Sequence, residues 1–539
     1  MNATPQTDSL RSKLTYEPRE MEFGTSGRRG KVVDLTQLEI YINALAELEC
    51  LQSLSPSEGG IVRGEEFFFA RDLRPSSNSF VPEQDGRGEI AQAIVTAIRD
   101  AGMRAVNLGC IPTPALACYA LARGKGSIMV TGSHIPFDRN GYKLNTSVGE
   151  LRKEQEAPIN ARVSQVRQRM YSQPADLSPF DARGLFKTGR QELPVEHGEA
   201  RGAWIGRFTS FFQGSSLNGA RVLVYQHSAV GRDLLVKILE HMGACPIAAG
   251  RSGTFVPIDT ENVGATQLAA IQTLADEAAA KHGSLHAIVS TDGDSDRPLI
   301  LGVDPATGQA RFFGGDLVGM VVAEYLKGDA VVVPITCNDA IDRGELASVV
   351  EPKTRIGSPY VIAGMEQARR KGKKRVCGWE PNGGFLTGSE IERNGAVLSA
   401  LLTRDAILPI LGVLLAASGS GISLLELFAR LPKRFSRAAL LAHFPRARGV
   451  KVVASLTGPH IAGFFTPELG FGVVTRVDRT DGVRILFDNG DVAHVRPSGN
   501  ADELRIYAVA DTQARADAIV AMGIAEPDGI LRRLERAAG

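Results

Sequence analysis

Residues 131–144 read Thr-Gly-Ser-His-Ile-Pro-Phe-Asp-Arg-Asn-Gly-Tyr-Lys-Leu and directly follow a short apolar run at residues 127–130. An apolar run that ends at turn-forming residues predicts a buried strand, with Ser133 on the loop that leaves it. Gly132 permits the close approach of a ligand. The same loop carries three donors that suit an anion: His134, Arg139 and Lys143. The stretch therefore predicts a seryl phosphate, with an ordinary exposed polar loop as the alternative.

Strands and helices alternate along the first part of the chain. Further strands are predicted at residues 67–70 and 105–108, and helices at residues 38–51, 90–101 and 116–122. This alternation predicts an α/β domain with a parallel or mixed sheet. Because ligands of such sheets bind beyond the carboxyl ends of the strands, the loop after residue 130 is in the right place for a binding site.

A second α/β unit contains the strongest local motif. Strands at residues 221–225 and 287–290 flank a helix at 233–242, and the second strand runs into Thr-Asp-Gly-Asp-Ser-Asp-Arg-Pro at residues 291–298. Three carboxylates at alternate positions of a tight loop can converge on one hard cation. They are Asp292, Asp294 and Asp296. An EF-hand is excluded because Arg297 stands where its turn requires Gly. The loop predicts Mg²⁺ completed by a phosphate oxygen, with a solvated acidic turn as the alternative.

Three other loops have compositions that suit a sugar phosphate. Residues 378–384 carry Glu380 and Asn382, which can hydrogen-bond vicinal hydroxyls. Residues 496–500, Arg-Pro-Ser-Gly-Asn, offer a guanidinium, a hydroxyl, an amide and backbone N–H groups to a phosphate. A glycine-rich run near the N-terminus presents Arg29 to an anion. Taken alone, each of the three is also compatible with an ordinary turn.

The rest of the chain is predicted to complete two more units. Residues 151–199 are expected to form a helix and an irregular linker, and a third α/β unit is expected to begin near residue 311. The apolar tract at 396–417 contains Thr-Arg-Asp and a proline, so a buried helix is favoured over a membrane span. A final α+β unit is predicted from strands at 452–455, 472–477, 483–487 and 504–509, and a helix from about Arg515.

The composition is that of a globular protein. The 539 residues are enough for about three or four domains. The 61 Lys and Arg balance the 60 Asp and Glu, so no overall field attracts nucleic acid or an acidic membrane. The six cysteines form no Cys-x-x-Cys pair and are expected to be reduced. Residues 1–20 lack the apolar core of a signal peptide, so we expect a cytoplasmic protein.

Together and in this order, the five loops resemble those of the α-D-phosphohexomutase family, which includes phosphomannomutases, phosphoglucomutases and phosphoglucosamine mutases. The loop at residues 131–144, which we call the serine loop, and the last loop, residues 496–500, look most like those of bacterial phosphomannomutases. The resemblance spans nearly the whole chain and implies three related α/β domains around a cleft, followed by a smaller α+β domain. The expected domains are residues 1–190, 191–306, 307–425 and 426–539.

The resemblance also implies a role for each matching residue. The Mg²⁺ shell, one ion per active site, would comprise Ser133, Asp292, Asp294 and Asp296, with Ser133 carrying the phosphoryl group. Assistance to proton transfer is implied for Arg29 and Lys143, and support of the transferring group for His134 and Arg297. Sugar contacts are implied for Glu380 and Asn382. The grip on the phosphate that is not reacting is implied for Arg496, Ser498, Gly499 and Asn500.

The activity implied is interconversion of mannose 6-phosphate and mannose 1-phosphate through phosphoserine and a hexose 1,6-bisphosphate, which also serves as activator, with glucose phosphates as further substrates. The protein would be a monomer or homodimer. Alternatives are a phosphoglucosamine mutase, a magnesium phosphatase, or a non-catalytic sugar-phosphate binding protein. The last is motivated by Asn-Ala-Asp at residues 500–502, where the family more often has Thr-Glu-Pro. Ser295 and the sequence Trp-Glu-Pro-Asn at residues 379–382 are further departures from the family pattern.

Overall fold

The first sheet places the serine loop at the end of a strand that is buried on both faces. The structure, a computed structural model, describes residues 8–24, 27–84, 87–261, 263–499 and 502–539. The strand order is β1 (Glu22–Phe23), β2 (Arg28–Lys31), β8 (Arg139–Asn145), β7 (Ser127–Val130), β3 (Glu66–Arg71) and β6 (Arg104–Cys110). Phe67 and Phe69 pack into one hydrophobic cluster and Phe68 into another. This alternation shows that the sheet is covered on both faces at β3 and at its neighbour β7.

Helices cover both faces of this sheet. They are α2 (Gln37–Leu51), α4 (Ile90–Asp100), α5 (Thr113–Leu121) and α6 (Lys153–Tyr171). Helix α2 packs against α4 and α6, and α5 packs against β3 and β7. Thr36 caps α2 by accepting a hydrogen bond from the backbone N–H of Glu39. The predicted helix at 38–51 is therefore confirmed, with its start fixed by a side-chain cap.

The second sheet repeats the strand, loop, strand arrangement around the aspartates. Its order is β10 (Cys245–Arg251), β9 (Arg221–His227), β11 (Ala287–Thr291), β12 (Pro298–Val303) and β13 (Ala310–Phe312). Strand β11 is parallel to β9 and antiparallel to β12, as β7 is parallel to β3 and antiparallel to β8. The helices of this unit are α7 (Glu199–Phe211), α8 (Arg232–His241) and α9 (Ala265–His282). The aspartate loop thus occupies the place in this sheet that the serine loop occupies in the first.

The third sheet has the same arrangement around residues 380–384, the loop that carries Glu380 and Asn382 and that we call the sugar loop. Its order is β14 (Ala330–Val332), β15 (Val376–Trp379), β16 (Phe385–Thr387) and β19 (Leu401–Asp405). Residues 380–384 connect β15 to its antiparallel neighbour β16. The helices are α10 (Gly315–Tyr325), α11 (Ser358–Arg370) and α12 (Ile407–Ser420). One hydrophobic cluster continues through all three units, from Phe68 through Val224 to Val331.

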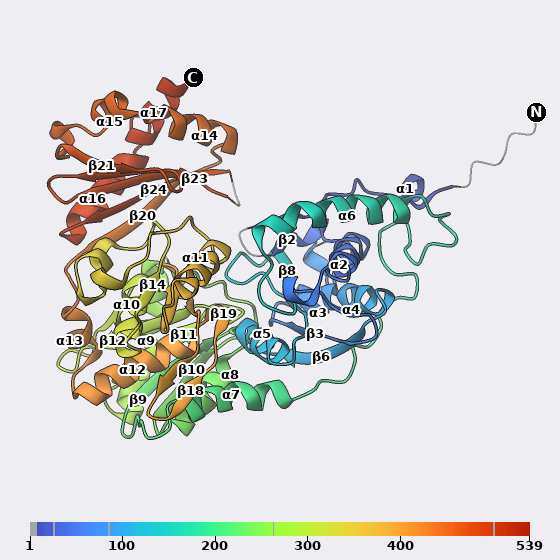
Figure 1. Ribbon diagram of the computed structural model, residues 1–539, viewed down its shortest axis with the longest axis horizontal. Helices are drawn as coiled ribbons and strands as arrows, with labels where there is room; N and C mark the ends of the chain where they lie inside the picture. The colour runs from blue at the N-terminus through green and yellow to red at the C-terminus, as the bar shows by residue number, and fades with distance from the viewer. Residues whose placement is uncertain (1–7, 25–26, 85–86, 262, 500–501) are drawn as a thin grey trace, which may run out of the picture.

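The C-terminal sheet is antiparallel throughout and has a hydrophobic cluster of its own. Its order is β20 (Phe435–Ala442), β24 (Glu503–Ala510), β23 (Val492–Pro497), β22 (Val483–Phe487) and β21 (Val474–Asp478). Its helices are α14 (Arg446–Ser455), α15 (Gly458–Phe464), α16 (Gln513–Ile524) and α17 (Ile530–Ala538). In Figure 1 this unit, in red, lies above the third unit, and the blue first unit lies to one side. The predicted α/β fold with a smaller α+β unit is confirmed.

Short elements complete the described chain. They are α1 (Leu10–Lys13), α3 (Pro75–Asn78), β4 (Phe80–Val81), β5 (Arg87–Gly88), β17 (Ile391–Arg393), β18 (Ala396–Leu398) and α13 (Leu424–Ala429). Within the described ranges, no helix combines the length and apolar character needed to cross a membrane.

Three sequence-based expectations about elements were wrong or incomplete. Residues 452–455, predicted as a strand, form the last turn of α14, in which Val452 is buried by helix packing. The tract at 396–417 is not one buried helix, because β18 and β19 precede α12. Several strands were not predicted, among them β20, β23 and β8, so Arg139 and Lys143 lie on a strand and not on the predicted loop. Strand β13 pairs with β12, so a boundary after residue 306 would divide one sheet, and we propose that the second domain extends to Phe312. The other domain boundaries stay predictions.

Candidate active site

The serine loop and the aspartate loop meet directly, although they belong to different sheets. Ser133 and Asp292 are both fully buried, and the Ser133 hydroxyl donates a hydrogen bond to Asp292 Oδ2 at 2.6 Å. The Lys143 ammonium donates to Asp294 Oδ2 and to Asp296 Oδ2, each at 2.6 Å. The structure therefore brings together a hydroxyl, a lysine and three carboxylates in one site.

Residues that follow β3 hold the backbone of the serine loop through hydrogen bonds. Ser133 has a φ of 54°, a left-handed conformation that a non-glycine residue keeps only when its surroundings hold it. Its backbone N–H donates to the Thr131 hydroxyl at 2.7 Å, and that hydroxyl donates to Asp72 at 2.8 Å. The Arg74 guanidinium donates to the carbonyls of Ser133 and Pro136 at 3.0 and 2.8 Å. These bonds fix the direction in which the Ser133 hydroxyl points.

The three carboxylates have different electrostatic surroundings. Burial, and then the charges of Asp294 and Asp296, raise the pKa of Asp292 well above its ordinary value. Burial alone would also raise the pKa of Asp294, but the Lys143 ammonium and the Thr113 hydroxyl lower it below its ordinary value. Three close carboxylates repel one another, so a positive charge at this point stabilises the group.

The carboxylate cluster fits a hard cation. Each aspartate offers one oxygen, and these oxygens lie within 4.8 Å of one another. Asp294 Oδ1 and Asp296 Oδ1 are buried and accept no hydrogen bond from the part of the chain that the structure describes. A buried carboxylate oxygen that accepts no hydrogen bond is costly, and an all-oxygen donor set is the kind that Mg²⁺ and Ca²⁺ prefer. The residues present therefore fit a bound divalent ion.

Arginines and a histidine surround Ser133. Arg29 Nη1 donates to the Gly132 carbonyl at 3.2 Å, and burial lowers the pKa of Arg29 to about 10. His134 Nδ1 lies 3.3 Å from the Ser133 hydroxyl. Burial, and then the charges of Arg297 and Arg29, hold the pKa of His134 well below its ordinary value, so its imidazole is neutral near pH 7. Arg297 Nε lies 3.6 Å from Asp296 Oδ1. The site thus presents donors and cations to an anion beside the hydroxyl.

The sugar loop reaches the same site through a side chain that the sequence patterns did not single out. Glu380 Oε2 accepts a hydrogen bond from Arg404 Nη1 at 2.9 Å, and Arg404 Nε donates to Asp296 Oδ2 at 3.1 Å. Asn382 shapes the loop, since its side-chain oxygen accepts from the Gly384 N–H at 3.0 Å. Glu380 and Asn382 are both buried, so they belong to the interior of the site and not to a solvated turn.

The last predicted loop lies at the end of β23, on the side of the C-terminal sheet nearest β2 and β8 in the view of Figure 1. Arg496 Nε contacts Asp481 Oδ1 at 3.3 Å, and the Ser498 N–H donates to the Glu503 carbonyl at 2.8 Å. Arg505 stands directly opposite Arg496 in the β23–β24 register, so both arginines lie on one face of the sheet. Gly499 ends the described stretch, and Asn500 lies outside the described residues.

Family models cover most of the chain. Those for phosphoglucomutase/phosphomannomutase alpha/beta/alpha domain I, alpha/beta/alpha domain III and the C-terminal domain match residues 20–170, 314–435 and 436–525. The chain belongs to the phosphoglucomutase/phosphomannomutase family. A phosphomannomutase of Sinorhizobium fredii is 38% identical over 94% of this chain and 98% of its own. Family membership confirms the expected enzyme class, an intramolecular phosphotransferase.

More distant comparisons agree with the family. A phosphoglucosamine mutase of Frankia casuarinae is 28% identical over 76% of this chain and 82% of its own. The crystal structure of a phosphoglucomutase/phosphomannomutase family protein from Burkholderia thailandensis has the same fold, with a TM-score of 0.66 and 18% identity over 95% of this chain and 97% of its own.

Several side chains in this family site were missed by the sequence patterns. Thr113 donates to Asp294 Oδ2 at 2.6 Å, and Arg404 joins two of the predicted loops. Asp72 and Arg74 hold the serine loop through hydrogen bonds. An apolar strand that ends at polar residues was the usable signal for Asp72 and Arg74, because the same signal identified Ser133. Arg404 was noticed only as a charge within an apolar tract.

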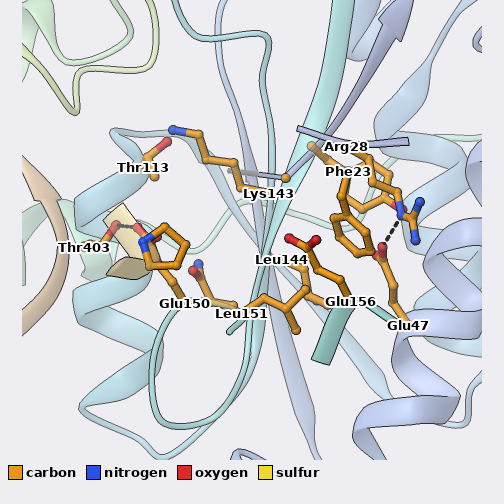
Figure 2. Close-up of a pocket in the computed structure, with 14 residues that line it drawn as sticks. Phe23, Arg28, Glu47, Thr113, Lys143, Leu144, Glu150, Leu151, Glu156 and Thr403 are labelled. Atoms are coloured by element: carbon orange, nitrogen blue, oxygen red, sulfur yellow. Dashed lines mark hydrogen bonds and ion pairs between the residues drawn. The ribbon is translucent and has the colours of Figure 1, made fainter. Parts of the chain in front are cut away.

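Figure 2 shows the pocket behind Lys143, between the first and third units. The Lys143 ammonium points away from this pocket toward Thr113, whereas the Glu150 carboxylate turns to Thr403 and accepts its hydroxyl at 2.6 Å. On the opposite wall, buried Arg28 donates to Glu47 at 2.6 Å. Arg28 precedes Arg29 on β2, so this buried ion pair fixes the strand from which Arg29 reaches the site.

Proposed function

We propose that the protein is a phosphomannomutase that interconverts mannose 6-phosphate and mannose 1-phosphate, and that it also acts on glucose phosphates. The observation that carries the proposal is the contact between the buried Ser133 hydroxyl and Asp292, within a cluster of three carboxylates. A hydroxyl beside a cation-binding cluster and the basic side chains of Lys143, Arg29 and Arg297 is suited to carrying a phosphoryl group. The similarity to a phosphomannomutase over nearly the whole chain supports the same substrate.

In the proposed cycle, Ser133 carries a phosphoryl group at rest and donates it to the free hydroxyl of a hexose monophosphate. The O–P bond to serine breaks as the bond to the sugar oxygen forms, which gives a hexose 1,6-bisphosphate. The bisphosphate then turns over, and its other phosphate returns to Ser133. Added hexose 1,6-bisphosphate would activate the enzyme because it can rephosphorylate a serine that has lost its phosphate.

The proposed metal is one Mg²⁺ per active site, held by Asp292, Asp294, Asp296 and the Ser133 phosphate. When bound, Mg²⁺ would neutralise charge on the oxygens of the transferring group. Arg29 and Arg297 would surround the remaining oxygens, and the neutral His134 would donate or accept a hydrogen bond beside the serine oxygen. These groups stabilise the charge that spreads over the phosphoryl group as it moves.

Lys143 is the proposed general acid and base for the sugar hydroxyl. Its ammonium lies between Asp294 and Asp296 and is almost fully buried. A proton must leave the hydroxyl that attacks and return to the serine oxygen or sugar oxygen that departs, and a buried lysine within reach of both can perform this exchange. Arg29 would assist by holding the same oxygens.

Glu380 and Asn382 would bind the sugar hydroxyls, while Arg496, Ser498, Gly499 and Asn500 would hold the phosphate that is not reacting. Arg505 joins this group in our proposal because it stands beside Arg496 on the sheet. The proposed partner is thus a hexose phosphate, and neither nucleic acid nor membrane. A cytoplasmic location and a monomeric or homodimeric state stay predictions.

A time course of ³¹P NMR spectra tests the function. The protein is mixed with mannose 1-phosphate, Mg²⁺ and a trace of glucose 1,6-bisphosphate, and glucose 1-phosphate and glucosamine 1-phosphate are run in parallel. The proposal is supported if the 6-phosphate signal grows fastest with mannose 1-phosphate as the substrate. Fastest conversion of glucosamine 1-phosphate would make the protein a phosphoglucosamine mutase. Release of inorganic phosphate without the 6-phosphate would indicate a phosphatase, and binding without conversion a non-catalytic protein.

A further inference from the structure

We propose that Arg404 is a positioning residue that couples the aspartate loop (residues 292–296) to the sugar loop (residues 380–384), so that one guanidinium sets the sugar's position relative to the transferring phosphate. This inference rests on the proposed function. It concerns a residue outside the five loops, on β19, which the sequence patterns identify only as a charge within an apolar tract.

The contacts of Arg404 run between two units. Its Nε donates to Asp296 Oδ2 at 3.1 Å in the second unit, and its Nη1 donates to Glu380 Oε2 at 2.9 Å in the third. Its side chain is only 3% exposed. Both acceptors are themselves buried, so these bonds are shielded from water and salt. A buried arginine with two carboxylate partners is a rigid connection between the loops.

The strand that carries Arg404 is also held in place by the first unit. The preceding residue, Thr403, donates its hydroxyl to Glu150 at 2.6 Å, and Ser358 at the start of α11 donates to the other oxygen of Glu150 at 2.8 Å. Neighbouring residues of a strand point to opposite faces. Consecutive residues of β19 therefore contact all three α/β units, Thr403 on one face and Arg404 on the other.

Packing leaves little freedom between Arg404 and the sugar loop. A Cβ atom added to Gly384 would lie 2.5 Å from Cδ of Arg404 and 2.8 Å from its Cβ. The backbone of the sugar loop thus lies directly against the stem of this arginine, and Gly384 is needed for the close approach. A change in the length or direction of the side chain would be transmitted to the loop that carries Glu380.

The two carboxylates depend on Arg404 to different degrees. Asp296 also accepts from Lys143, whereas Glu380 accepts no other side-chain hydrogen bond within the described ranges. A buried carboxylate without a partner is costly, so the Glu380 side chain would move if Arg404 were lost. That movement would weaken its hold on a sugar hydroxyl. Arg404 acts on the sugar through Glu380 and is not itself a catalytic residue.

A double-mutant cycle tests this coupling. The variants are Arg404→Lys, Glu380→Gln and the double variant, and kcat/KM is measured with mannose 1-phosphate. Lysine keeps the charge but cannot reach both carboxylates with a rigid fork. We expect Arg404→Lys to lower kcat/KM about tenfold or more in the wild-type background, and less than about twofold in the Glu380→Gln background. Equal losses in the two backgrounds, or no loss in either, would overturn the proposal.

Chemical rescue separates positioning from a general role in folding. Arg404→Ala is assayed with and without guanidinium at concentrations below those that unfold the protein, and recovery of at least about fivefold is expected if the missing group is a guanidinium between two carboxylates. For Arg404→Lys, the matched control is Arg167→Lys on α6, a largely buried arginine that pairs with Glu39 away from the site, and this variant should retain its activity. No recovery in an Arg404→Ala protein with an unchanged melting temperature counts against the proposal.

The wild-type assay distinguishes the two possible failures. If wild type converts mannose 1-phosphate and the cycle is additive, only the Arg404 proposal fails. If wild type prefers another hexose phosphate, the proposed substrate is wrong, and the cycle with that sugar must still be non-additive. If wild type converts none of the three sugar phosphates, the proposed function and the role of Arg404 fail together.

Discussion

The two ends of the site are built differently. At the reacting end, Ser133 and its carboxylate neighbour Asp292 are fully buried, and the hydrogen bond between them joins separate units. At the distal end, Arg496 pairs with Asp481 of its own unit, and Arg505 pairs with Glu503 two residues away. The reacting end is therefore assembled by contacts between units, whereas the distal end is assembled within one.

The hydrophobic cores show the same difference. A single cluster continues through the three α/β units, but the C-terminal unit has its own. It meets the third unit through polar contacts: Arg434, directly before β20, donates to Asp339 of the third unit and to Asp511 of the C-terminal unit, and Arg484 donates to the Ile335 carbonyl. Phosphoryl transfer needs fixed distances, while a clamp on the other phosphate must accept either end of the sugar. A rigid reacting end and a separately folded distal end meet these two needs.

The largest expected effect follows from removing Ser133, the proposed phosphoryl carrier at the rigid end. We expect Ser133→Ala to lower mutase turnover by more than about 10³-fold, because the phosphoryl group then has no covalent carrier. The ³¹P assay measures the loss, and mass spectrometry checks that the phosphorylated form is absent. Ser164→Ala, an exposed position on α6, is the control. Retained turnover in Ser133→Ala would exclude a phosphoserine intermediate.

Metal removal should have the next largest effect. A chelator should abolish turnover, and added Mg²⁺ should restore it. In Asp294→Asn one carboxylate charge is lost while the shape is kept, so at least about tenfold more Mg²⁺ should be needed for half-maximal activity. Calorimetry of Mg²⁺ binding provides a readout besides activity. Unchanged Mg²⁺ affinity in Asp294→Asn would mean that the cation binds elsewhere.

The reacting end could be predicted from sequence because its signals are local. The serine, aspartate and sugar loops each follow a short buried strand, and in each case the next strand is its antiparallel neighbour. Apolar runs that end in turn-forming polar residues are visible without any knowledge of the fold. The order of these loops then identified the family.

Other parts of the molecule could not be predicted, because their role depends on partners far away in the sequence. Arg404 bonds Asp296 across 108 positions, and Thr113 bonds Asp294 across 181. No local pattern contains such pairs. The strand predicted at 452–455 was wrong for a related reason, since two neighbouring valines suit a strand or one face of a helix, and packing of α14 against β23 decides between them.

Substitution at the distal end should weaken binding without stopping phosphoryl transfer. We expect Arg496→Ala and Arg505→Ala each to raise KM for hexose monophosphates about 10- to 100-fold, the value of one charged hydrogen bond. Loss of phosphate from phosphoserine to water should change less than about threefold, because that step uses only the reacting end. If kcat/KM for the mutase reaction and the rate of phosphoserine hydrolysis fell by the same factor, the two ends would not be separable. Arg437→Ala, exposed on β20, is the control.

The smallest expected effect concerns a histidine that supports the distal end. Buried His494 donates from Nε2 to the Asp481 carbonyl at 2.6 Å, and Asp481 in turn contacts Arg496. Burial, and then the charge of Arg484, lower the pKa of His494 to about 3. The unfolded chain takes up this proton near pH 6.5, while the folded chain stays neutral, so unfolding becomes easier as the pH falls below about 6.5.

Comparison of wild type with His494→Gln isolates this contribution. At pH 7.5 the variant should be less stable, by about 1 kcal/mol for a lost buried hydrogen bond. Between pH 7.5 and pH 5 wild type should lose about 2 kcal/mol relative to the variant, since only wild type carries the titrating group. Urea-induced unfolding, monitored by hydrogen exchange in β22 and β23 at each pH, measures the stability difference and its change with pH. A stability difference that does not change with pH would mean that the folded and unfolded chains take up this proton at the same pH, so that burial does not lower the pKa of His494.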